Sequence, residues 1–280
     1  MRHFKNKNIL ITGGARGIGW QIALEFAQRG ANIIICDADK DFMDSSAFKE
    51  SIKEIEDLGV ACLHYFLDVV DVDVIKDVRS NIKSDIGKID VLVNNAGVVF
   101  GGRFLDIDIR KHHLTYDVNT QGIINMTYVF LDDLISRDSA HIVNIASASG
   151  FTSLPGGATY ASSKAAVSSF SESLSVELKK DGIDHVGMTI VCPAYVNTGM
   201  FDGVKEPILI PMLRPDRLAK KIVKAVVGGR LFVLEPTFIK FVPALKALLP
   251  RFIFDFLGNI LGGFNSMDLW TGHNSKEIKK

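Results

Sequence analysis

The fold of this chain is decided by residues 8–19, which read NILITGGARGIG. The apolar run 8–11 leads directly into a glycine-rich turn, and an amphipathic stretch from Ile18 to Arg29 follows. A buried strand, glycines and a helix in this order are the context of a dinucleotide site. Glycines let the backbone approach a pyrophosphate, and the helix amino terminus offers it free N–H groups. The spacing TGxxxGxG predicts this turn without fixing the enzyme class, and the alternative is a tight turn without a ligand.

The next apolar strand ends in an acid. Asp37 follows residues 32–36, about twenty residues after the glycines, where a carboxylate can accept hydrogen bonds from both adenosine ribose hydroxyls. A carboxylate there repels a 2′-phosphate and favours NAD. Arg16 favours NADP instead, because a guanidinium can pair with that phosphate. We give Asp37 more weight, since it stands where the extra phosphate must go, and we expect NAD, with NADP less favoured.

A tyrosine and a lysine four residues apart supply the candidate chemistry. Tyr160 and Lys164, in the run YASSK, fall on one face of a helix. A free phenol has a pKa of about 10, and a neighbouring cation favours the phenolate. Tyr160 is therefore a candidate general acid and base. The pair alone is weak evidence for a catalytic role, because the same spacing occurs on many helix surfaces. The other motifs of the chain strengthen that interpretation.

Further polar residues follow three other predicted strands. Asp68 ends the strand 61–67, and it either contacts the adenine amino group or caps the helix that starts near Val72. The run NNAG at 94–97 follows one strand, and Ser147 follows another. All of these lie at the carboxyl edge, where open α/β sheets bind their ligands.

This ordered set of motifs resembles the short-chain dehydrogenase/reductase family. Its motifs are TGxxxGxG, an acid after the second strand, NNAG, a helix asparagine, a serine, YxxxK and a proline after the sixth strand. All are present here, with Asn119 as the helix asparagine and Pro193 as the proline, followed by alanine where the family commonly has glycine. The resemblance covers residues 5–235. The run VNTG at 196–199 and the tail 241–252 are similar to the branch of retinol and 17β-hydroxysteroid dehydrogenases.

The resemblance implies reversible hydride transfer between NAD(P) and a secondary alcohol or ketone. Tyr160 would exchange the hydroxyl proton, and Ser147 would hydrogen-bond the same oxygen. Lys164 would lower the tyrosine pKa and hold the nicotinamide ribose. Asn119 would position a water that links Lys164 to solvent, and Thr198 would fix the carboxamide. The expected cofactor-binding residues are Gly13, Arg16, Gly17, Ile18, Gly19, Asp37, Asp68, Val69, Asn95, Ala96, Gly97, Tyr160, Lys164, Pro193, Val196 and Thr198.

The rest of the chain alternates regularly between strands and helices. We predict strands at 8–12, 32–36, 61–67, 89–93, 139–146, 184–192 and 231–234, and helices near 18–29, 45–58, 71–85, 114–136, 158–180 and 215–227. Consecutive β-α-β units force parallel pairing with right-handed crossovers. The prediction is an α/β fold, a doubly wound Rossmann domain with a seven-stranded parallel sheet and helices on both faces. No linker divides it, so residues 1–280 are expected to form a single domain.

Composition narrows the function classes. The 280 residues carry 32 acidic and 32 basic side chains, so no electrostatic footprint for nucleic acid is present. Three cysteines on apolar strands suggest buried thiols in a reducing compartment, without disulfides or a metal site. The first strand starts near residue 8, which leaves no room for a signal peptide. We expect a cytoplasmic homodimer or homotetramer.

The segment 207–270 is unusually apolar, with leucines and phenylalanines at helical spacing. Lys240, Lys246, Arg251 and Asp255 interrupt the run before about 20 residues accumulate, so it is not expected to span a bilayer. Three interpretations stay open: a lid over the substrate, a subunit contact, or an amphipathic helix on a membrane surface that would make the protein a peripheral one.

The sequence limits the class of substrate but does not identify the substrate. Mostly apolar residues are expected around the cleft, which favours a steroid, retinoid or long acyl alcohol over a sugar. The alternatives are an NADP-dependent reductase of acyl-type ketones and a non-catalytic regulatory protein that binds a nucleotide, since fold does not imply function. The expected cleft residues are Val98, Phe100, Ser149, Phe151, Leu154, Tyr195 and Phe201.

Overall fold

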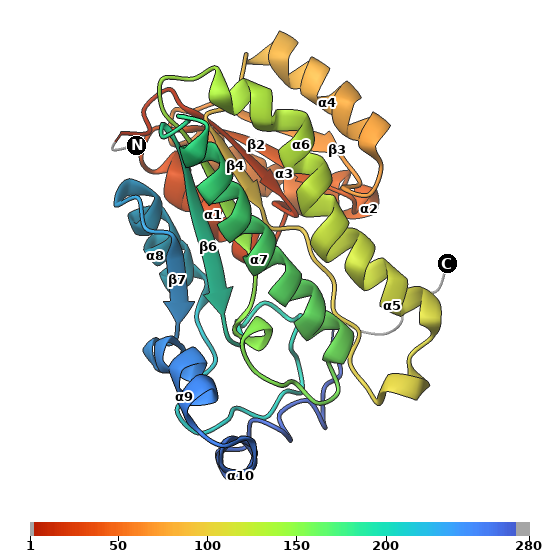
Figure 1. The fold of residues 1–280 in the computed structure, drawn as a ribbon. Coiled ribbons are helices and arrows are strands. Elements are labelled where there is room, and N and C mark those ends of the chain that lie inside the picture. The colour runs from red at the N-terminus through yellow and green to blue at the C-terminus, as the bar shows by residue number, and fades with distance from the viewer. Residues whose placement is uncertain (1–2, 273–280) are drawn as a thin grey trace.

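A computed structural model describes residues 3–272 and shows one sheet of seven parallel strands in the order β3-β2-β1-β4-β5-β6-β7 (Figure 1). The order reverses between β1 and β4, which creates the switch point at which open α/β sheets bind ligands. The predicted doubly wound Rossmann fold is confirmed. The strands are β1 (Asn8–Thr12), β2 (Asn32–Asp37), β3 (Cys62–Phe66), β4 (Val91–Asn94), β5 (Ala140–Ile145), β6 (Val186–Pro193) and β7 (Phe232–Glu235).

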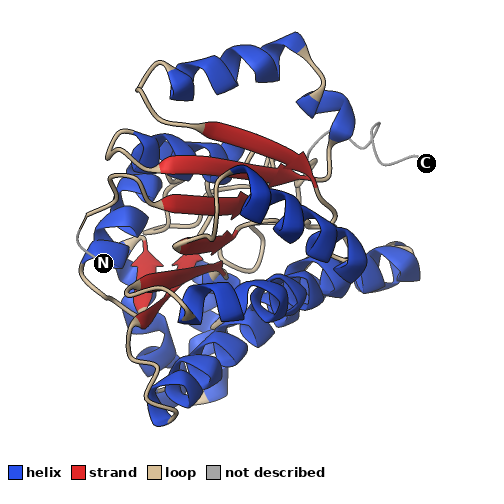
Figure 2. Ribbon diagram, turned by 90° about the horizontal axis from the view of Figure 1, so that it is seen from above, coloured by secondary structure: helices blue, strands red, loops and turns tan. Residues whose placement is uncertain are grey.

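Helices cover both faces of this sheet (Figure 2). The α-helices of the described residues are α1 (Gly17–Ala27), α2 (Lys40–Met43), α3 (Ser46–Glu56), α4 (Val72–Asp85), α5 (Ile109–Tyr116), α6 (Gly122–Ile135), α7 (Ala158–Lys180), α8 (Pro215–Val227), α9 (Val242–Leu248) and α10 (Arg251–Ile260), of which α9 and α10 lie beyond the carboxyl end of β7 (Figure 1). Successive side chains of a strand point to opposite faces, so Ile9 and Ile11 join the apolar layer under α1, α3 and α8, and Leu10 joins the layer under α4, α6 and α7. Both faces are buried, which explains the continuous apolar runs in the strands.

One predicted helix differs from the structure. The expected helix 114–136 begins earlier, at Ile109, because Asp108 caps it by accepting a hydrogen bond from the backbone N–H of Arg110. A π-helical turn over Asp117–Gln121 then separates α5 from α6. Such turns are rare and concentrate at functional sites, and this one contains Asn119. The sequence analysis also missed the short helix α2, which Asp39 caps.

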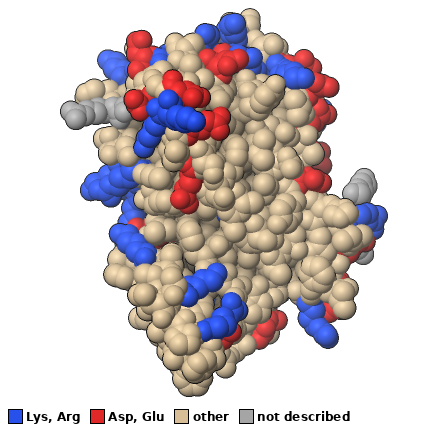
Figure 3. Space-filling model, in the orientation of Figure 1, with Lys and Arg blue, Asp and Glu red and all other residues tan. Residues whose placement is uncertain are grey.

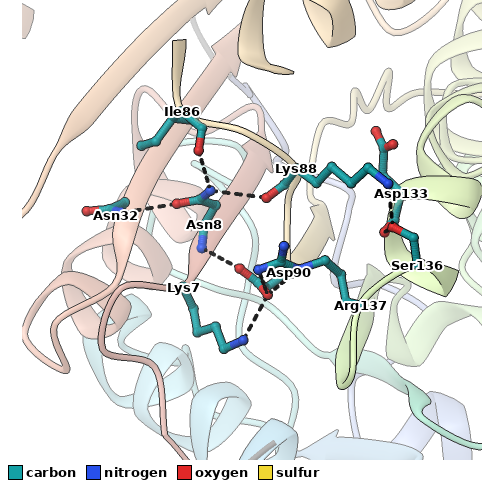
Figure 4. A network of polar contacts seen from close by, with 9 residues as sticks. All are labelled: Lys7, Asn8, Asn32, Ile86, Lys88, Asp90, Asp133, Ser136 and Arg137. Atoms are coloured by element: carbon teal, nitrogen blue, oxygen red, sulfur yellow. Dashed lines mark hydrogen bonds and ion pairs between the residues drawn. The ribbon is translucent and has the colours of Figure 1, made fainter. Parts of the chain in front are cut away.

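The amino edge of the sheet is closed by a buried carboxylate (Figure 4). Asp90 is fully buried just before β4 and accepts hydrogen bonds from Lys7 Nζ at 3.0 Å, Arg137 Nε at 2.7 Å and the backbone N–H of Asn8 at 2.9 Å. The Asn8 side chain donates to the carbonyl of Ile86. The charges of Lys7, Asp90 and Arg137 are therefore paired with one another, and this network ties the start of β1 to the start of β4.

Two further findings concern membrane spans and cysteines. Within residues 3–272, no helix has the length and apolarity needed to cross a membrane. The three cysteines Cys36, Cys62 and Cys192 are buried, as expected, and burial raises the pKa of each thiol. Raised thiol pKa values make these side chains unreactive.

Candidate active site

The glycine turn between β1 and α1 forms a backbone cradle at the carboxyl edge. Gly13 and Gly17 have φ angles of +59° and +61°, which side-chain-bearing residues rarely adopt. A Cβ on Gly13 would lie 2.9 Å from the Cα of Ala96, and one on Gly19 would collide with the carbonyl of Gly13. Bare backbone at this helix start fits the phosphates of a dinucleotide, as the sequence predicts.

The end of β4 holds this cradle in place. Asn95 Nδ2 donates to the carbonyls of Thr12 at 3.0 Å and Gly13 at 2.8 Å. Thr12 Oγ1 accepts from the backbone N–H groups of Asn95 and Ala96. Ile18 packs against the apolar layer beneath α1. Asn95, Ala96 and Ile18 therefore shape the turn through protein contacts.

The two charges weighed for cofactor choice lie beside this turn. Asp37 Oδ2 accepts from the backbone N–H of Ala15 at 3.2 Å. The Arg16 guanidinium pairs with Asp39 and stacks over the ring of Phe42, with Cζ 5.0 Å from the ring centroid. The sequence analysis missed Asp39. Its position two residues after Asp37, in the run CDAD, was the available signal.

The structure contradicts one of the two interpretations of Asp68, and the contact with adenine stays a prediction. The Asp68 carboxylate accepts from the backbone N–H of Val70 at 3.0 Å, and Asp71 caps α4 in its place. The helix-cap interpretation of Asp68 is therefore wrong. Val69 is buried against Gly122 of α6, where a Cβ would collide with the valine side chain. This contact fixes the backbone that carries Asp68.

Tyr160 and Lys164 lie one turn apart near the start of α7. Their exposed fractions are 7% and 3%. Lys164 Nζ lies 5.9 Å from the centroid of the Tyr160 ring and donates a hydrogen bond to the carbonyl of Ile145 at 2.8 Å. A Cβ on Gly97 would lie 3.4 Å from Lys164 Nζ, so the glycine keeps the space beside the ammonium open. The structure thus brings the NNAG and YxxxK motifs together.

Burial dominates the protonation of both groups. It raises the pKa of Tyr160 to about 12, although the Ser147 hydroxyl opposes this shift. Burial lowers the pKa of Lys164 to about 8. We expected the lysine to lower the tyrosine pKa, and within the protein alone desolvation outweighs any such effect. The site therefore holds a neutral phenol beside an ammonium that loses its proton readily.

Asn119 is engaged entirely within the protein. Its Oδ1 accepts from the backbone N–H of Val98 at 2.8 Å, while Nδ2 donates to the Val98 carbonyl at 2.9 Å and to Ser163 Oγ at 3.1 Å. These bonds fasten the loop after β4 to α7. The side chain positions the residues around Lys164, and its predicted role in holding a water stays a prediction.

The segment after β6 completes the site. Ser147 Oγ lies 3.4 Å from the carbonyl of Pro193 and accepts from the backbone N–H of Ser149. Val196 is buried and pairs with Leu213. Thr198 faces the glycine turn, since a Cβ on Gly17 would lie 3.5 Å from its side chain. Thr198 therefore lies beside the glycine cradle and Pro193 beside Ser147.

A cavity of about 330 Å³ opens beside Tyr160 and Ser147. Four of the expected cleft residues line it, namely Ser149, Leu154, Tyr195 and Phe201. Val98, Phe100 and Phe151 do not, and Phe151 turns toward Phe232 of β7 instead. The largest part of the lining comes from the carboxyl-terminal segment, for which a lid over the substrate was one of three open interpretations, although its individual lining residues were not predicted: Phe238, Ile239, Val242, Leu245, Leu249, Phe254, Leu257, Leu261 and Phe264.

Comparison with known proteins agrees with this geometry. The model of the short chain dehydrogenase family matches residues 7–208. The chain is 32% identical to epidermal retinol dehydrogenase 2 of Mus musculus over 271 residues, covering 96% of this chain and 86% of that protein. It is 32% identical to short-chain dehydrogenase/reductase 3 of Homo sapiens over 274 residues, covering 97% and 89%. A solved short chain dehydrogenase/reductase from Burkholderia phymatum in complex with NAD superposes with a TM-score of 0.79 at 25% identity, covering 88% and 95%.

Proposed function

This chain belongs to the short-chain dehydrogenase family and is an NAD(P)-dependent oxidoreductase, and we propose that its substrate is a bulky apolar alcohol or ketone. The observation that carries the proposal is the cavity of about 330 Å³ into which Tyr160 and Ser147 open, because almost all of its other lining side chains are apolar. Its similarity to retinol dehydrogenases, predicted from the run at 196–199 and the tail, points to substrates of retinoid or steroid size.

The chain's own residues fit a nicotinamide dinucleotide. That cofactor supplies the hydride acceptor or donor when bound. The bare backbone of Gly13 and Gly17 suits the phosphates, and Asp37 suits the ribose hydroxyls. Thr198, beside Gly17, and Lys164, beside Gly97, are assigned to the nicotinamide half.

Tyr160 moves the proton in either direction. In reduction its neutral phenol donates to the carbonyl oxygen, and burial keeps that form, since it raises the tyrosine pKa to about 12. In oxidation the phenol must first lose its proton, which requires positive charge nearby, and Lys164 is the cation that α7 places one turn away. Ser147 hydrogen-bonds the reacting oxygen and stabilises its developing charge.

NAD is the preferred cofactor in this proposal. Asp37 places a carboxylate at the ribose end of the site, and the Arg16 guanidinium is paired with Asp39. A 2′-phosphate would be repelled by the Asp37 carboxylate and would have to compete with Asp39 for the Arg16 guanidinium.

The segment 207–270 acts as the substrate lid. Support comes from the cavity lining, because residues of α9, α10 and the stretch before α9 form its outer wall. A cytoplasmic location and a homodimeric or homotetrameric state also belong to the proposal, and sedimentation of the purified protein tests the oligomeric state.

A substrate panel tests the proposed function. The protein is incubated with NAD or NADP and with all-trans-retinol, a hydroxysteroid, a long-chain alcohol and a sugar alcohol, and NADH or NADPH absorbance is followed. We expect turnover of at least one apolar alcohol with NAD, and none with the sugar alcohol. Turnover of the sugar alcohol alone, or no turnover although NAD binds, would contradict the proposal.

A further inference from the structure

The outer face of α10 is apolar and exposed. Phe252, Phe256 and Ile260 recur every fourth residue and are 74%, 62% and 56% exposed. A polar stripe, Arg251, Asp255 and Asn259, runs beside them at the same spacing. No residue of α10 is buried, although the helix is strongly apolar. Within residues 3–272, nothing covers this face.

The exposed apolar surface continues beyond α10. Leu248 of α9, Phe241 just before it and Leu209 are also exposed, and the backbone N–H of Ile208 donates to the carbonyl of Leu261 just past the end of α10. We call this surface, made of Leu209, Phe241, Leu248, Phe252, Phe256 and Ile260, the apolar tip. α10 lies beyond the carboxyl ends of β6 and β7 in Figure 1, and the lower end of Figure 3 is mostly uncharged, with a few basic side chains and some acidic atoms beside them.

The charge around the apolar tip is basic. Residues 236–264 contain Lys240, Lys246 and Arg251 but a single acid, Asp255. Arg251 Nε bonds Asp255 at 2.7 Å, and Lys246 reaches only a backbone carbonyl, that of Phe151. A two-fold contact between copies of this surface would place like charges together, whereas an anionic lipid surface would attract them.

The apolar tip also continues into the substrate cavity. Phe254 and Leu257 of α10 and Leu261 just after it line the cavity, while Phe252 and Phe256 are exposed on the same helix. One helix therefore separates the cavity from whatever covers the outer face, with apolar side chains on both sides. An apolar path from the outer face of α10 to the cavity has no use if a soluble protein covers that face. It is useful if a lipid phase covers it, because an apolar substrate dissolved in the lipid could follow that path into the cavity.

We propose that the apolar tip docks on an anionic lipid surface, with α10 lying in the headgroup region and its phenylalanines among the acyl chains. An amphipathic helix with phenylalanines on one face binds membranes in this way, and the basic residues Lys240 and Lys246 lie in the segments that precede α10. Docking would place the cavity wall against the lipid, from which an apolar substrate enters. Only this entry step rests on the proposed function, because docking itself needs no turnover.

Vesicle flotation without substrate or cofactor tests the docking. The full chain is mixed with vesicles of phosphatidylcholine, or of phosphatidylcholine with phosphatidylserine, and the floated fraction is measured. We expect binding to the anionic vesicles, and Phe252→Ser with Phe256→Ser should weaken it at least tenfold. The matched control is Leu58→Ser with Leu105→Ser, which removes two exposed leucines from a turn after α3 and from residues 104–106, and it should bind like the wild type.

A charge variant and sedimentation complete the test. Lys240→Glu should weaken binding to anionic vesicles by about fivefold or more and leave the thermal unfolding temperature unchanged. Failure of the wild type to float, or equal flotation of the phenylalanine variant, would overturn the proposal. A wild-type oligomer that the phenylalanine variant alone dissociates would also overturn it, in favour of a contact between copies. Since activity is not the readout, inactivity on every alcohol would leave this result standing.

Discussion

The two edges of the sheet bury polar groups in opposite ways. At the amino edge, the Asp90 carboxylate receives three hydrogen bonds, two of them from Lys7 and Arg137. At the carboxyl edge, the Lys164 ammonium donates to one backbone carbonyl, and burial displaces the pKa values of both Lys164 and Tyr160. A buried charge with full pairing supports the fold, whereas a buried group with few partners keeps a proton available for transfer.

The largest expected effect is at the carboxyl edge, where one substitution should lower kcat strongly and change the free energy of unfolding little. Tyr160→Phe should lower kcat by about 10²–10⁴-fold, because the phenol oxygen moves the proton. The ring keeps its contact with Phe201, so the unfolding free energy should change by less than about 1 kcal/mol. Steady-state rates and thermal unfolding of the same preparation measure both.

Tyr195→Phe is the matched control for this change. Tyr195 is also buried and meets Phe201 edge to face, but its hydroxyl hydrogen-bonds the Ser266 hydroxyl at 2.7 Å. It should lose about 1 kcal/mol of stability and keep most of its kcat. If both variants lose activity equally, Tyr160 has no special part in proton transfer.

Next in size is the energetic cost of burying Lys164. Burial lowers its pKa from the usual 10.5 to about 8 on folding, so between these pH values the unfolded chain binds more protons and stability rises with pH. The burial cost is fully present below pH 8. Lys164→Met should therefore be more stable than the wild type at pH 7, by about 3 kcal/mol, and should lose that advantage toward pH 10.

Denaturant unfolding of both proteins at several pH values measures this difference. Tyr160 and the three thiols have raised pKa values, so they lower stability at high pH, but they do so in both proteins. A difference between the two curves that does not change with pH would contradict the assignment.

The amino edge should respond with stability alone. Asp90→Asn removes the charge that Lys7 and Arg137 share and should cost about 2 kcal/mol, since hydrogen bonds to charged groups contribute about 1.5–3 kcal/mol. Asp73→Asn, at an exposed pair with Lys76, should cost less than about 1 kcal/mol. Activity per folded molecule should be unchanged in both variants. A selective loss of kcat in Asp90→Asn would contradict the assignment of the amino edge to stability alone.

The smallest expected effect concerns the cofactor. Asp37→Ser removes the carboxylate from the ribose end, so kcat/KM for NADP should rise and that for NAD should fall, reversing a preference of about tenfold. Asp39→Asn should add to the effect by releasing Arg16. A wild-type protein that uses NADP better than NAD would make Arg16 the dominant charge.

The sequence determined the strands, the glycine turn and the spacing of the candidate catalytic residues. These features depend on neighbours: apolar runs for β1 to β7, positive φ angles at Gly13 and Gly17, and a spacing of four for Tyr160 and Lys164. Each of these features depends on residues that are close together in the sequence, so it can be predicted from a single sequence.

Only the tertiary structure decided the long-range contacts, the burial and the pKa values of these residues. The Asp90 network joins residues more than 80 positions apart, and the cavity beside Tyr160 is closed by side chains from 238–264. Burial, more than the neighbouring lysine, sets the direction of the tyrosine pKa. Desolvation and long-range contact depend on the packing of the whole chain, and no local pattern of residues records them.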